Sequence, residues 1–545
     1  MKHLHKRVCI STTRDTSEGI MVKNMNILLI NPPYDFKNDT VVDSLFLQPV
    51  QSMGLGYLAS YMEREGHHVN VLECPPNNLR WKDINEEIMG GSYEIIGLSV
   101  YSYNYKNVSL LGNRIKKAYP RIVLVIGGFL ATISVDEMFQ SIPDLDYCVL
   151  GEGEETFKEL ADAIEKRQVI PTGINGVAYK SEGLVIINEF RKVLTDLDVL
   201  PLPKISYLSP NGMAAIISGR GCHGRCSFCS VSTYIKRLKG RYCRKRNPSN
   251  IVSEINNLVS NYNVKYISFH DDSFFTTNRE WVEGFVSCMN KDCIPVEFSI
   301  SARADDIINY ENEIIQLADI GLKYVFVGAE SFIQRQLDLY RKGTTVEENI
   351  RAINILKDNG IKCGLGIMLL DPYVCIEEVR DNLSALDIVG YARERYNDFP
   401  PVSLLYPVTC VKGSSFERLL KENGLYKPNA IGYDFIDPKV QKFYQIQRIW
   451  ADKLYPLNKA CSIHGKAYLR EYYHIAEKLL DQKIALRELD ILFCFKLCED
   501  VMETKQLDPQ EYIYSWQQKL DEINECVMHL SDSLDMILGQ HAYTS

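Results

Sequence analysis

Several features of membrane, secreted and nucleic-acid-binding proteins are missing from this sequence of 545 residues. No apolar run approaches the roughly 20 residues needed to cross a bilayer, and the longest candidate, residues 122–133, is interrupted by two glycines. The first 25 residues contain no apolar stretch typical of a secretory signal. The formal net charge is −9, whereas a broad phosphate-binding surface needs an excess of basic residues. We therefore expect a cytoplasmic protein without membrane contact, and we do not expect nucleic acid as its partner.

The pattern of a disulfide framework is also missing, although the chain contains 16 cysteines. Disulfide-rich frameworks belong to short secreted chains, and most cysteines here stand alone within apolar stretches. Three differ, because Cys222, Cys226 and Cys229 have C-x3-C-x2-C spacing in the segment SGRGCHGRCSFCS. Sixteen cysteines scattered at random would rarely produce this spacing, so the three residues are candidate ligands of a metal centre.

The fold class predicted for the chain is α/β, beginning with a doubly wound parallel sheet in residues 26–190. Short apolar strands alternate there with helical segments, and ligands of such sheets bind at the carboxyl ends of the strands. Residues 176–188 predict a closing hairpin around Glu182-Gly183. Residues 1–25 precede this Rossmann-like domain as an extension, and a proline-rich linker at 191–210 follows it. The strands are predicted at 26–30, 69–73, 94–100, 122–128 and 146–150.

A second β/α series in residues 211–413 predicts a partial (β/α)6 barrel, whose active site lies where the strands end. Residues 414–545 have apolar positions at helical spacing and no strand pattern, which predicts a helical C-terminal domain. Its clearest helices are predicted at 468–482 and 484–503, and barrel helices at 248–261 and 346–359. The six barrel strands are predicted at 214–219, 264–270, 296–302, 322–329, 362–370 and 402–408.

Three thiolates on one tight loop after the first barrel strand can hold either of two kinds of metal centre. A structural zinc site needs a fourth ligand, which Cys243 or His223 could supply, since no second C-x2-C pair follows. A [4Fe-4S] cluster is otherwise held by four cysteines, so three would leave one iron open for a substrate or cofactor. The cluster is the preferred interpretation, and zinc stays open.

The cysteine loop, at the end of the first strand of a six-strand β/α series, resembles the signature of radical S-adenosylmethionine (SAM) enzymes. This resemblance implies that the three cysteines hold a [4Fe-4S] cluster whose open iron binds the amino and carboxylate groups of SAM. One electron then cleaves SAM to methionine and a 5′-deoxyadenosyl radical. For Phe228 the alternative role is ordinary packing, and for Arg303 it is a surface ion pair. The SAM-binding residues implied by the resemblance are Phe228, Asp271, Asp272, Arg303, Glu330, Ser331 and Met368.

Residues 26–190 resemble the cobalamin-binding domain that precedes the barrel in one radical SAM subclass, through NPPY, IIGLSVYSYN, VIGGFLAT and DYCVLGEGEETF. Small residues at these positions let a corrinoid tail lie close to the sheet, although a tight strand-to-helix turn also explains paired glycines. Many cobalamin domains have D-x-H-x-x-G after strand one, with the histidine below cobalt, but residues 31–40 (NPPYDFKNDT) contain no histidine. The implied cobalamin-binding residues are Asn31, Ser99, Tyr101, Gly127, Gly128, Gly151, Glu152 and Gly153.

The leading hypothesis is a cobalamin-dependent radical SAM enzyme that transfers a methyl group to an unactivated carbon. Its partners are a small-molecule or peptide substrate and a flavodoxin or ferredoxin-type electron donor. The second hypothesis keeps the cofactors but performs a rearrangement, cyclisation or ring contraction, and a cobalamin domain that has lost its cofactor is a further alternative. The third is a non-catalytic iron–sulfur or zinc redox sensor, which would need no polar residues at successive strand ends. The resemblance implies that the C-terminal domain helps to shape the substrate pocket.

Overall fold

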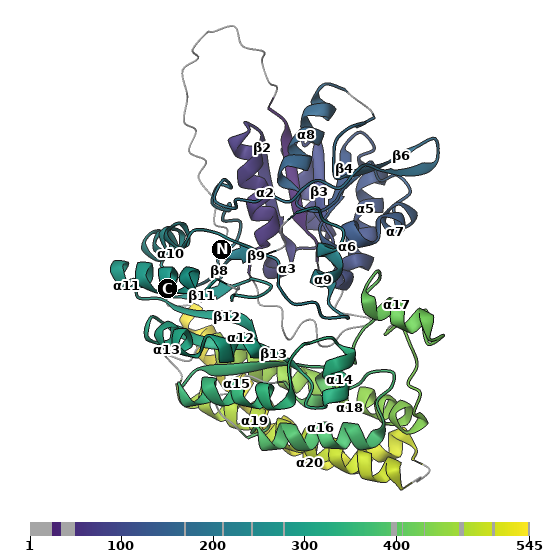
Figure 1. Cartoon of the computed structure of the whole chain (residues 1–545), viewed down its shortest axis with the longest axis vertical. Coiled ribbons are helices and arrows are strands. Elements are labelled where there is room, and N and C mark those ends of the chain that lie inside the picture. Colours follow the sequence, from purple (N-terminus) through teal and green to yellow (C-terminus); the bar gives the residue numbers. More distant parts are fainter. Residues whose placement is uncertain are drawn as a thin grey trace.

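The computed structural model of the chain has two lobes, one built on the N-terminal sheet and one on the barrel with the C-terminal helices (Figure 1). No helix in the described part of the chain is long and apolar enough to cross a membrane. The structure describes residues 24–33, 50–167, 170–209, 212–240, 243–275, 278–393, 400–405, 407–429, 431–467, 473–503 and 507–542.

The N-terminal sheet has seven strands in the order β2-β1-β3-β4-β5-β6-β7. The first five strands of the chain pair in parallel, and β6 and β7 add an antiparallel edge. The chain runs from β1 outward to β2 and returns to β3 on the other side of β1, which makes the β1/β3 boundary a topological switch point. The strands are β1 (Asn26–Asn31), β2 (His68–Glu73), β3 (Ile95–Ser99), β4 (Val123–Gly127), β5 (Tyr147–Val149), β6 (Val177–Ser181) and β7 (Leu184–Ile187).

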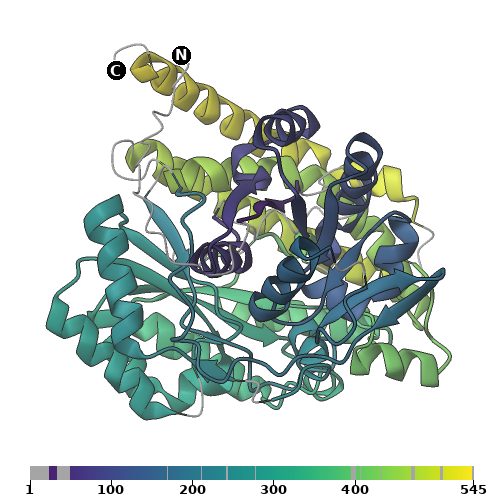
Figure 2. The same ribbon diagram turned by 90° about the horizontal axis from the view of Figure 1, so that it is seen from above.

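Helices cover both faces of this sheet because alternate strand residues point to opposite sides. Leu28 and Ile30 pack in one buried cluster with α4 (Trp81–Gly91), α5 (Tyr105–Ala118) and α7 (Val135–Ser141). Ile27 and Leu29 pack in another with α2 (Met53–Arg64) and α8 (Glu154–Glu165), and Figure 2 shows this lobe from above. The predicted doubly wound sheet is confirmed. Shorter helical segments are α3 (Cys74–Asn77), η1 (Ser102–Asn104) and α6 (Phe129–Ile133).

The barrel sheet has five parallel strands whose spatial order, β8-β11-β12-β13-β14, is also their order in the chain. A short antiparallel pair, β9 (Gly219–Arg220) with β10 (Arg244–Lys245), follows the first strand. The strands are β8 (Met213–Ile216), β11 (Tyr266–Phe269), β12 (Glu297–Arg303), β13 (Leu322–Glu330) and β14 (Lys362–Ile367). The helices are α9 (Ser230–Ile235), α10 (Pro248–Tyr262), α11 (Arg279–Asp292), α12 (Ala304–Asn309), α13 (Glu311–Asp319), α14 (Gln334–Leu339), α15 (Val346–Asp358) and α16 (Ile376–Ile388).

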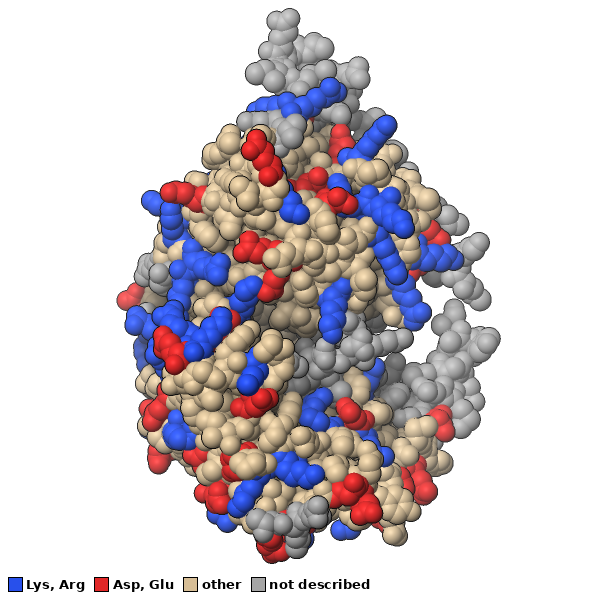
Figure 3. Space-filling model, turned by 90° about the vertical axis from the view of Figure 1, so that its right-hand side faces the viewer, with Lys and Arg blue, Asp and Glu red and all other residues tan. Residues whose placement is uncertain are grey.

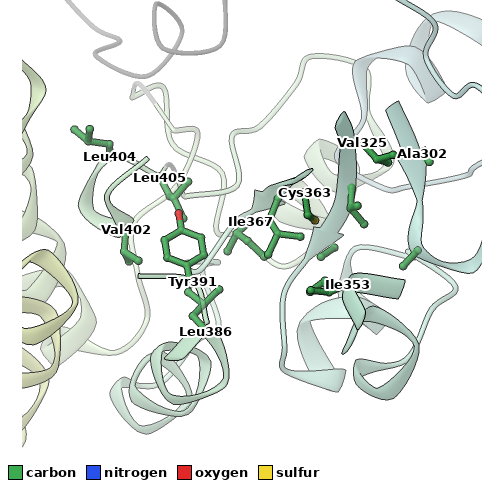
Figure 4. Close-up of a cluster of buried hydrophobic side chains, with 14 of the residues drawn as sticks. Ala302, Val325, Ile353, Cys363, Ile367, Leu386, Tyr391, Val402, Leu404 and Leu405 are labelled. Carbon is green, nitrogen blue, oxygen red and sulfur yellow. The ribbon is translucent and has the colours of Figure 1, made fainter. Parts of the chain in front are cut away.

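The sixth predicted barrel strand, 402–408, is wrong for the residues described there. Val402–Leu404 forms a 3₁₀ helix, η2, that packs against α18 (Pro438–Ala467) and α19 (Tyr473–Met502). The Ser403 N–H donates to Asp490 on α19, and Val408 makes one backbone hydrogen bond to Leu370 instead of a ladder. Figure 4 shows Val402 and Leu405 beside Tyr391. The apolar run is buried, as a strand would be, but against helices.

The C-terminal region is helical, as predicted, with α17 (Ser415–Glu422) followed by the long helices α18, α19 and α20 (Pro509–Ala542). The three long helices pack on one another, and their buried residues share one hydrophobic core with the barrel. Residues 473–502 form a single helix where two were expected, because no proline or glycine interrupts them. Residues 468–472, the start of the first expected helix, lie outside the described residues. Overall, the predicted α/β fold class is confirmed.

Candidate functional site

The three clustered cysteines lie on the loop between β9 and α9, beyond the carboxyl end of the first barrel strand. Cys226 is buried, whereas Cys222 and Cys229 are half-buried. Burial raises the pKa of the Cys229 thiol to about 11 and also raises the pKa of Cys222, so these two sulfurs would become thiolates at neutral pH only beside a positive group such as a metal centre. A Cβ at Gly224 would lie 2.9 Å from Nη1 of Arg303 and 3.3 Å from Sγ of Cys222. This close approach explains why glycine occupies that position.

The donor set fits a cluster better than a zinc ion. Zinc draws its ligands to within about 2.0–2.3 Å of one point, whereas the cysteines of a cubane bind separate irons. Among the residues that the structure describes, no three His, Cys, Asp or Glu side chains converge on such a point. Both proposed fourth zinc ligands make other contacts: Sγ of Cys243 lies 3.9 Å from the carbonyl of Gly221, and Nε2 of His223 lies 3.5 Å from Asp306.

Ser227, between the second and third cysteines, anchors the loop to two other elements. Its N–H donates to the carbonyl of Tyr340 (2.7 Å), and its hydroxyl donates to the carbonyl of Leu339 (2.8 Å). Its own carbonyl accepts from the N–H of Phe416 at the start of α17 (3.0 Å). The loop conformation is therefore fixed by the segment after α14 and by α17, before any cofactor is added.

The two candidate aspartates at the end of β11 differ in availability. The buried carboxylate of Asp271 accepts from the Ser218 N–H (3.1 Å), the Ser218 hydroxyl (2.9 Å) and the Gly219 N–H (2.6 Å). Asp272 accepts only from the N–H of Gly221, at 3.2 Å among the described residues, and is exposed. The arrangement favours a structural role for Asp271 at the β8–β9 corner and leaves Asp272 able to meet a ligand.

Arg303, at the end of β12, is held against the cysteine loop. Its Nε and Nη2 bind Asp305 at 2.9 and 3.1 Å, and Nη2 also donates to the carbonyl of Lys342 (2.5 Å). Its Nη1 lies 3.7 Å from Sγ of Cys226. The guanidinium fork is therefore occupied by Asp305, and Nη1 is the atom directed toward the cysteines.

The two candidate residues at the end of β13 also differ in their availability to a ligand. Glu330 has a left-handed backbone (φ 66°), and its carboxylate binds the buried Nζ of Lys342 at 2.9 Å. Ser331 is fully buried, and its hydroxyl is bound within the protein to Gln336 (2.5 Å) and Asn382 (3.3 Å). These contacts favour a structural role for Ser331, and its contact with a ligand stays a prediction.

Phe228 and Met368 both meet Tyr340. The half-buried Phe228 ring packs edge-on against Tyr340, with centroids 5.5 Å apart. The carbonyl of Met368, just after β14, accepts from the Tyr340 hydroxyl at 3.2 Å, and its N–H donates to the carbonyl of Glu330. The ends of β13 and β14 and the cysteine loop are thereby brought together around one buried ring.

At the N-terminal sheet, the candidate small residues lie where β3, β4 and β5 end. Gly128 follows β4 with φ 106°, and a Cβ there would lie 3.0 Å from the carbonyl of Val100. Ser99 ends β3, and its side chain hydrogen-bonds to Tyr101, whose pKa is raised by burial. Gly127 ends β4, where a Cβ would make only ordinary contacts with Val149. Gly128 is thus a position where the backbone itself requires glycine, and Gly151, after β5, is another, with φ 79°.

Asn31 ends β1, beside the switch point, and binds a carboxylate of the protein itself. Its buried amide donates to Glu73 (2.7 Å), which also accepts from Ser52 N–H (2.7 Å) and Ser206 (3.1 Å). The equivalent of the cobalt-ligating histidine motif, residues 31–40, lies outside the described residues from residue 34 onward. The amide of Asn31 is therefore already hydrogen-bonded to Glu73, although Asn31 lies at the strand end, as expected.

Glu152, between Gly151 and Gly153, makes an ion-pair network across the two lobes. Arg244 binds it bidentately, at 2.6 and 3.0 Å, and Nη1 of Arg220 lies 3.5 Å away. Arg220 also binds Glu154 at 2.5 Å. All four side chains are largely buried, so these charges interact in a poorly screened environment. These ion pairs neutralise the Glu152 carboxylate without a ligand. They also tie the Gly151–Gly153 turn to the strand that leads into Cys222.

Two residues of this site escaped the sequence analysis. Arg220 stands two positions before Cys222, a spacing that could have drawn attention to it. Lys342 is buried within the range of Arg303 and Cys226, but no motif singles it out, because it lies in a turn beyond α14. Both became visible only through their contacts.

We expect Asp272→Asn to weaken SAM binding in the cluster-loaded protein. A hydrogen bond to a charged group contributes about 1.5–3 kcal/mol, which corresponds to about tenfold or more in affinity. Although Asp272 keeps exposed surface, desolvation by the protein packed around its carboxyl and then the charge of Asp271 raise the Asp272 pKa to about 6. Wild-type affinity should therefore fall as the pH drops through 6, whereas the variant should be flat, as measured by anaerobic calorimetry from pH 5 to 8.

The same shift makes the variant more stable above pH 6. A raised carboxyl pKa means that ionisation of Asp272 opposes folding there, and asparagine removes this cost. Asp292→Asn, at the exposed end of α11, is the matched control and should change neither quantity. An unchanged affinity and pH profile in Asp272→Asn would show that another group receives the SAM ammonium.

Two sequence family models match the chain, a B12 binding domain over residues 40–161 and the radical SAM superfamily over residues 216–385. An uncharacterized methyltransferase (PH0819) of Pyrococcus horikoshii is 27% identical over 426 residues, covering 76% of this chain and 88% of the relative. An anaerobic magnesium-protoporphyrin IX monomethyl ester cyclase of Rubrivivax gelatinosus is 28% identical over 349 residues, covering 62% of this chain and 61% of that protein.

Solved structures share the fold at low identity. The cobalamin-dependent SAM radical enzyme OxsB, with aqua-cobalamin and SAM bound, superposes with a TM-score of 0.72 at 18% identity, over 95% of this chain and 81% of that chain. The radical SAM methyltransferase TsrM of Kitasatospora setae, with tryptophan and a SAM analogue, gives 0.58 at 17% identity, over 78% and 89% of the two chains. These matches span both lobes of the present structure.

Proposed function

The chain belongs to the radical SAM enzymes that carry a cobalamin-binding domain, and from this premise we propose that it transfers a methyl group to an unactivated carbon of its substrate. Bound together, the [4Fe-4S] cluster, SAM and cobalamin would supply a 5′-deoxyadenosyl radical and a transferable methyl group. Methyltransferases among its relatives support this choice.

The observation that carries the proposal is the network of Glu152, Glu154, Arg220 and Arg244. It joins the end of β5, in the B12-binding lobe, to the strand entering the cysteine loop. A methyl carrier and a radical source must reach the same substrate carbon, since effective catalysis depends on reacting groups being held close together. Two independent binding modules would not need buried charges between them.

We assign roles to the chain's own side chains as follows. The thiolates of Cys222, Cys226 and Cys229 hold the cluster, Nη1 of Arg303 and the buried Lys342 keep positive charge beside it, and Asp272 receives the SAM amino group. Phe228, Met368 and Glu330 line the adenosyl side around Tyr340. Ser99, Tyr101, Gly127, Gly128, Gly151 and Gly153 form the corrinoid edge.

We propose a domain division at residues 26–190, 191–210, 211–413 and 414–545. The two buried clusters of the first sheet stay within the first of these segments. The helices after residue 414 share a core with the barrel, which supports a part for them in shaping the substrate pocket. A flavodoxin or ferredoxin-type protein would supply the single electron.

Incubation of the reconstituted protein with SAM carrying a deuterated methyl group and with candidate substrates tests the proposal. We expect 5′-deoxyadenosine together with a product heavier by one deuterated methyl group, detected by mass spectrometry. A control without cobalamin should still form deoxyadenosine but no methylated product. Deoxyadenosine and a product without added carbon would instead support cyclisation or rearrangement, the function named for the 28%-identical cyclase relative.

A further inference from the structure

Three exposed cations surround the backbone of the cysteine loop: Lys236, at the end of α9; Arg341, after α14; and Arg418, on α17. We call these residues the basic triad. They come from three separate elements, so their gathering at one place is a property of the fold. None of them forms an ion pair with a carboxylate in the part of the chain that the structure describes.

The triad is tied to Ser227, the residue that directly follows Cys226. Ser227 receives Phe416 N–H at its carbonyl, two residues before Arg418, and donates its own N–H to Tyr340, the neighbour of Arg341. The Nζ of Lys236 donates to the hydroxyl of Ser415, beside Phe416, at 2.7 Å. These hydrogen bonds connect the positive surface to the backbone between two of the cluster ligands.

The two charges that shift the pKa of Lys236 are both positive. Burial, and then the charges of Arg418 and Arg341, lower the pKa of Lys236 from its usual value. Like charges held near one another repel, and an anionic surface placed against them would convert this repulsion into attraction. Figure 3 looks onto the side that carries α17, and lysine and arginine side chains border the hollow between the two lobes there.

We propose that the basic triad is the docking surface for an acidic one-electron donor protein of the flavodoxin or ferredoxin type. This inference rests on the proposed function, which requires one electron for each SAM cleaved. A flavodoxin hydroquinone would become the semiquinone, and its single electron would reduce the cluster from the 2+ to the 1+ state. Docking beside Ser227 gives that electron a covalent and hydrogen-bonded route to two cluster ligands.

Charge reversal of the full triad, Lys236→Glu with Arg341→Glu and Arg418→Glu, tests this surface in the reconstituted full-length protein. The probe is flavodoxin kept reduced by its reductase, and the readout is the rate of cluster reduction followed by absorbance. We expect the rate at low salt to fall at least about tenfold, since electrostatic steering raises association rates by about 10–10³. The wild-type rate should fall with added salt, and the variant's should not.

A matched control reverses three exposed lysines at the opposite ends of the barrel strands, Lys265, Lys323 and Lys362. Its rate should match the wild type. Equal rates in the triad variant and this control would overturn the proposal.

Dithionite, a small reductant that needs no docking surface, separates this inference from the proposed function. Deoxyadenosine formation driven by dithionite should be the same in the triad variant and the wild type. If dithionite produced no deoxyadenosine in the wild type either, the proposed function would fail. A variant impaired with dithionite as well would show a damaged cysteine loop and would count against a role confined to docking.

Discussion

Replacing Cys222, Cys226 and Cys229 together with alanine is expected to abolish both iron binding and 5′-deoxyadenosine formation. The wild-type protein should take up about four irons per chain on anaerobic reconstitution, because a [4Fe-4S] cluster depends on its thiolates. Iron analysis and the visible charge-transfer bands measure the first effect, and chromatography of the nucleoside measures the second. Deoxyadenosine should fall to the background of a cluster-free sample.

Matched controls separate this effect from a general loss of thiols. Cys288, Cys293 and Cys375 are half-buried or exposed and lie away from the loop, so their joint replacement should leave the iron content unchanged. Cys243 lies beside Gly221 but should also be dispensable, because a fourth thiolate would block the open iron. Full cluster content in the triple loop variant would refute the assignment, and loss of iron in Cys243→Ala would favour a fully ligated centre.

Gly128→Leu is expected to weaken cobalamin binding strongly while the cluster still assembles on the barrel. At φ 106° a leucine is strained, and its Cβ would lie 3.0 Å from the carbonyl of Val100. Overpacking of this kind costs about 1–3 kcal/mol, so affinity for hydroxocobalamin should fall by about 5- to 150-fold. Equilibrium binding followed by absorbance measures the loss, and iron content should stay at the wild-type value.

Two further variants show whether backbone strain or steric blocking of the corrinoid edge weakens cobalamin binding in Gly128→Leu. Gly183→Leu carries a similar backbone strain (φ 81°) at the hairpin tip, where no atom lies within 4 Å of the new Cβ, and it should bind cobalamin normally. Gly127→Leu has no such strain, and its Cβ would make ordinary contacts, so weakened binding there would result from blocking the corrinoid edge itself. Normal binding in both Gly127→Leu and Gly128→Leu would place cobalamin elsewhere.

The bound cobalamin is expected to have its benzimidazole displaced from cobalt, with no protein histidine in its place. A nucleotide tail that passes Ser99 and Gly128 cannot also fold back onto the metal, and NPPYDFKNDT contains no imidazole. Paramagnetic resonance of the cob(II)alamin form reports an axial nitrogen as triplet splitting of the cobalt lines. Triplets would contradict this expectation.

The sequence by itself determined the architecture and the position of the cysteine loop. Strand and helix periodicities and the hairpin at Glu182-Gly183 are local patterns, and so is the spacing of the three cysteines. Local patterns report which residues are buried and where the backbone turns. The run 402–408 shows their limit, since burial against α18 and α19 produces the same apolar pattern as burial in a sheet.

Only the tertiary structure decided which polar side chains stay available to a ligand. Asp271 and Asp272 are adjacent in the sequence, yet the β8–β9 corner occupies the first and leaves the second open. Glu152 has a cofactor-binding position by motif, but Arg244, 92 residues away, binds its carboxylate. Buried polar groups must find partners because leaving them unpaired is costly, and those partners come from segments that sequence proximity does not connect.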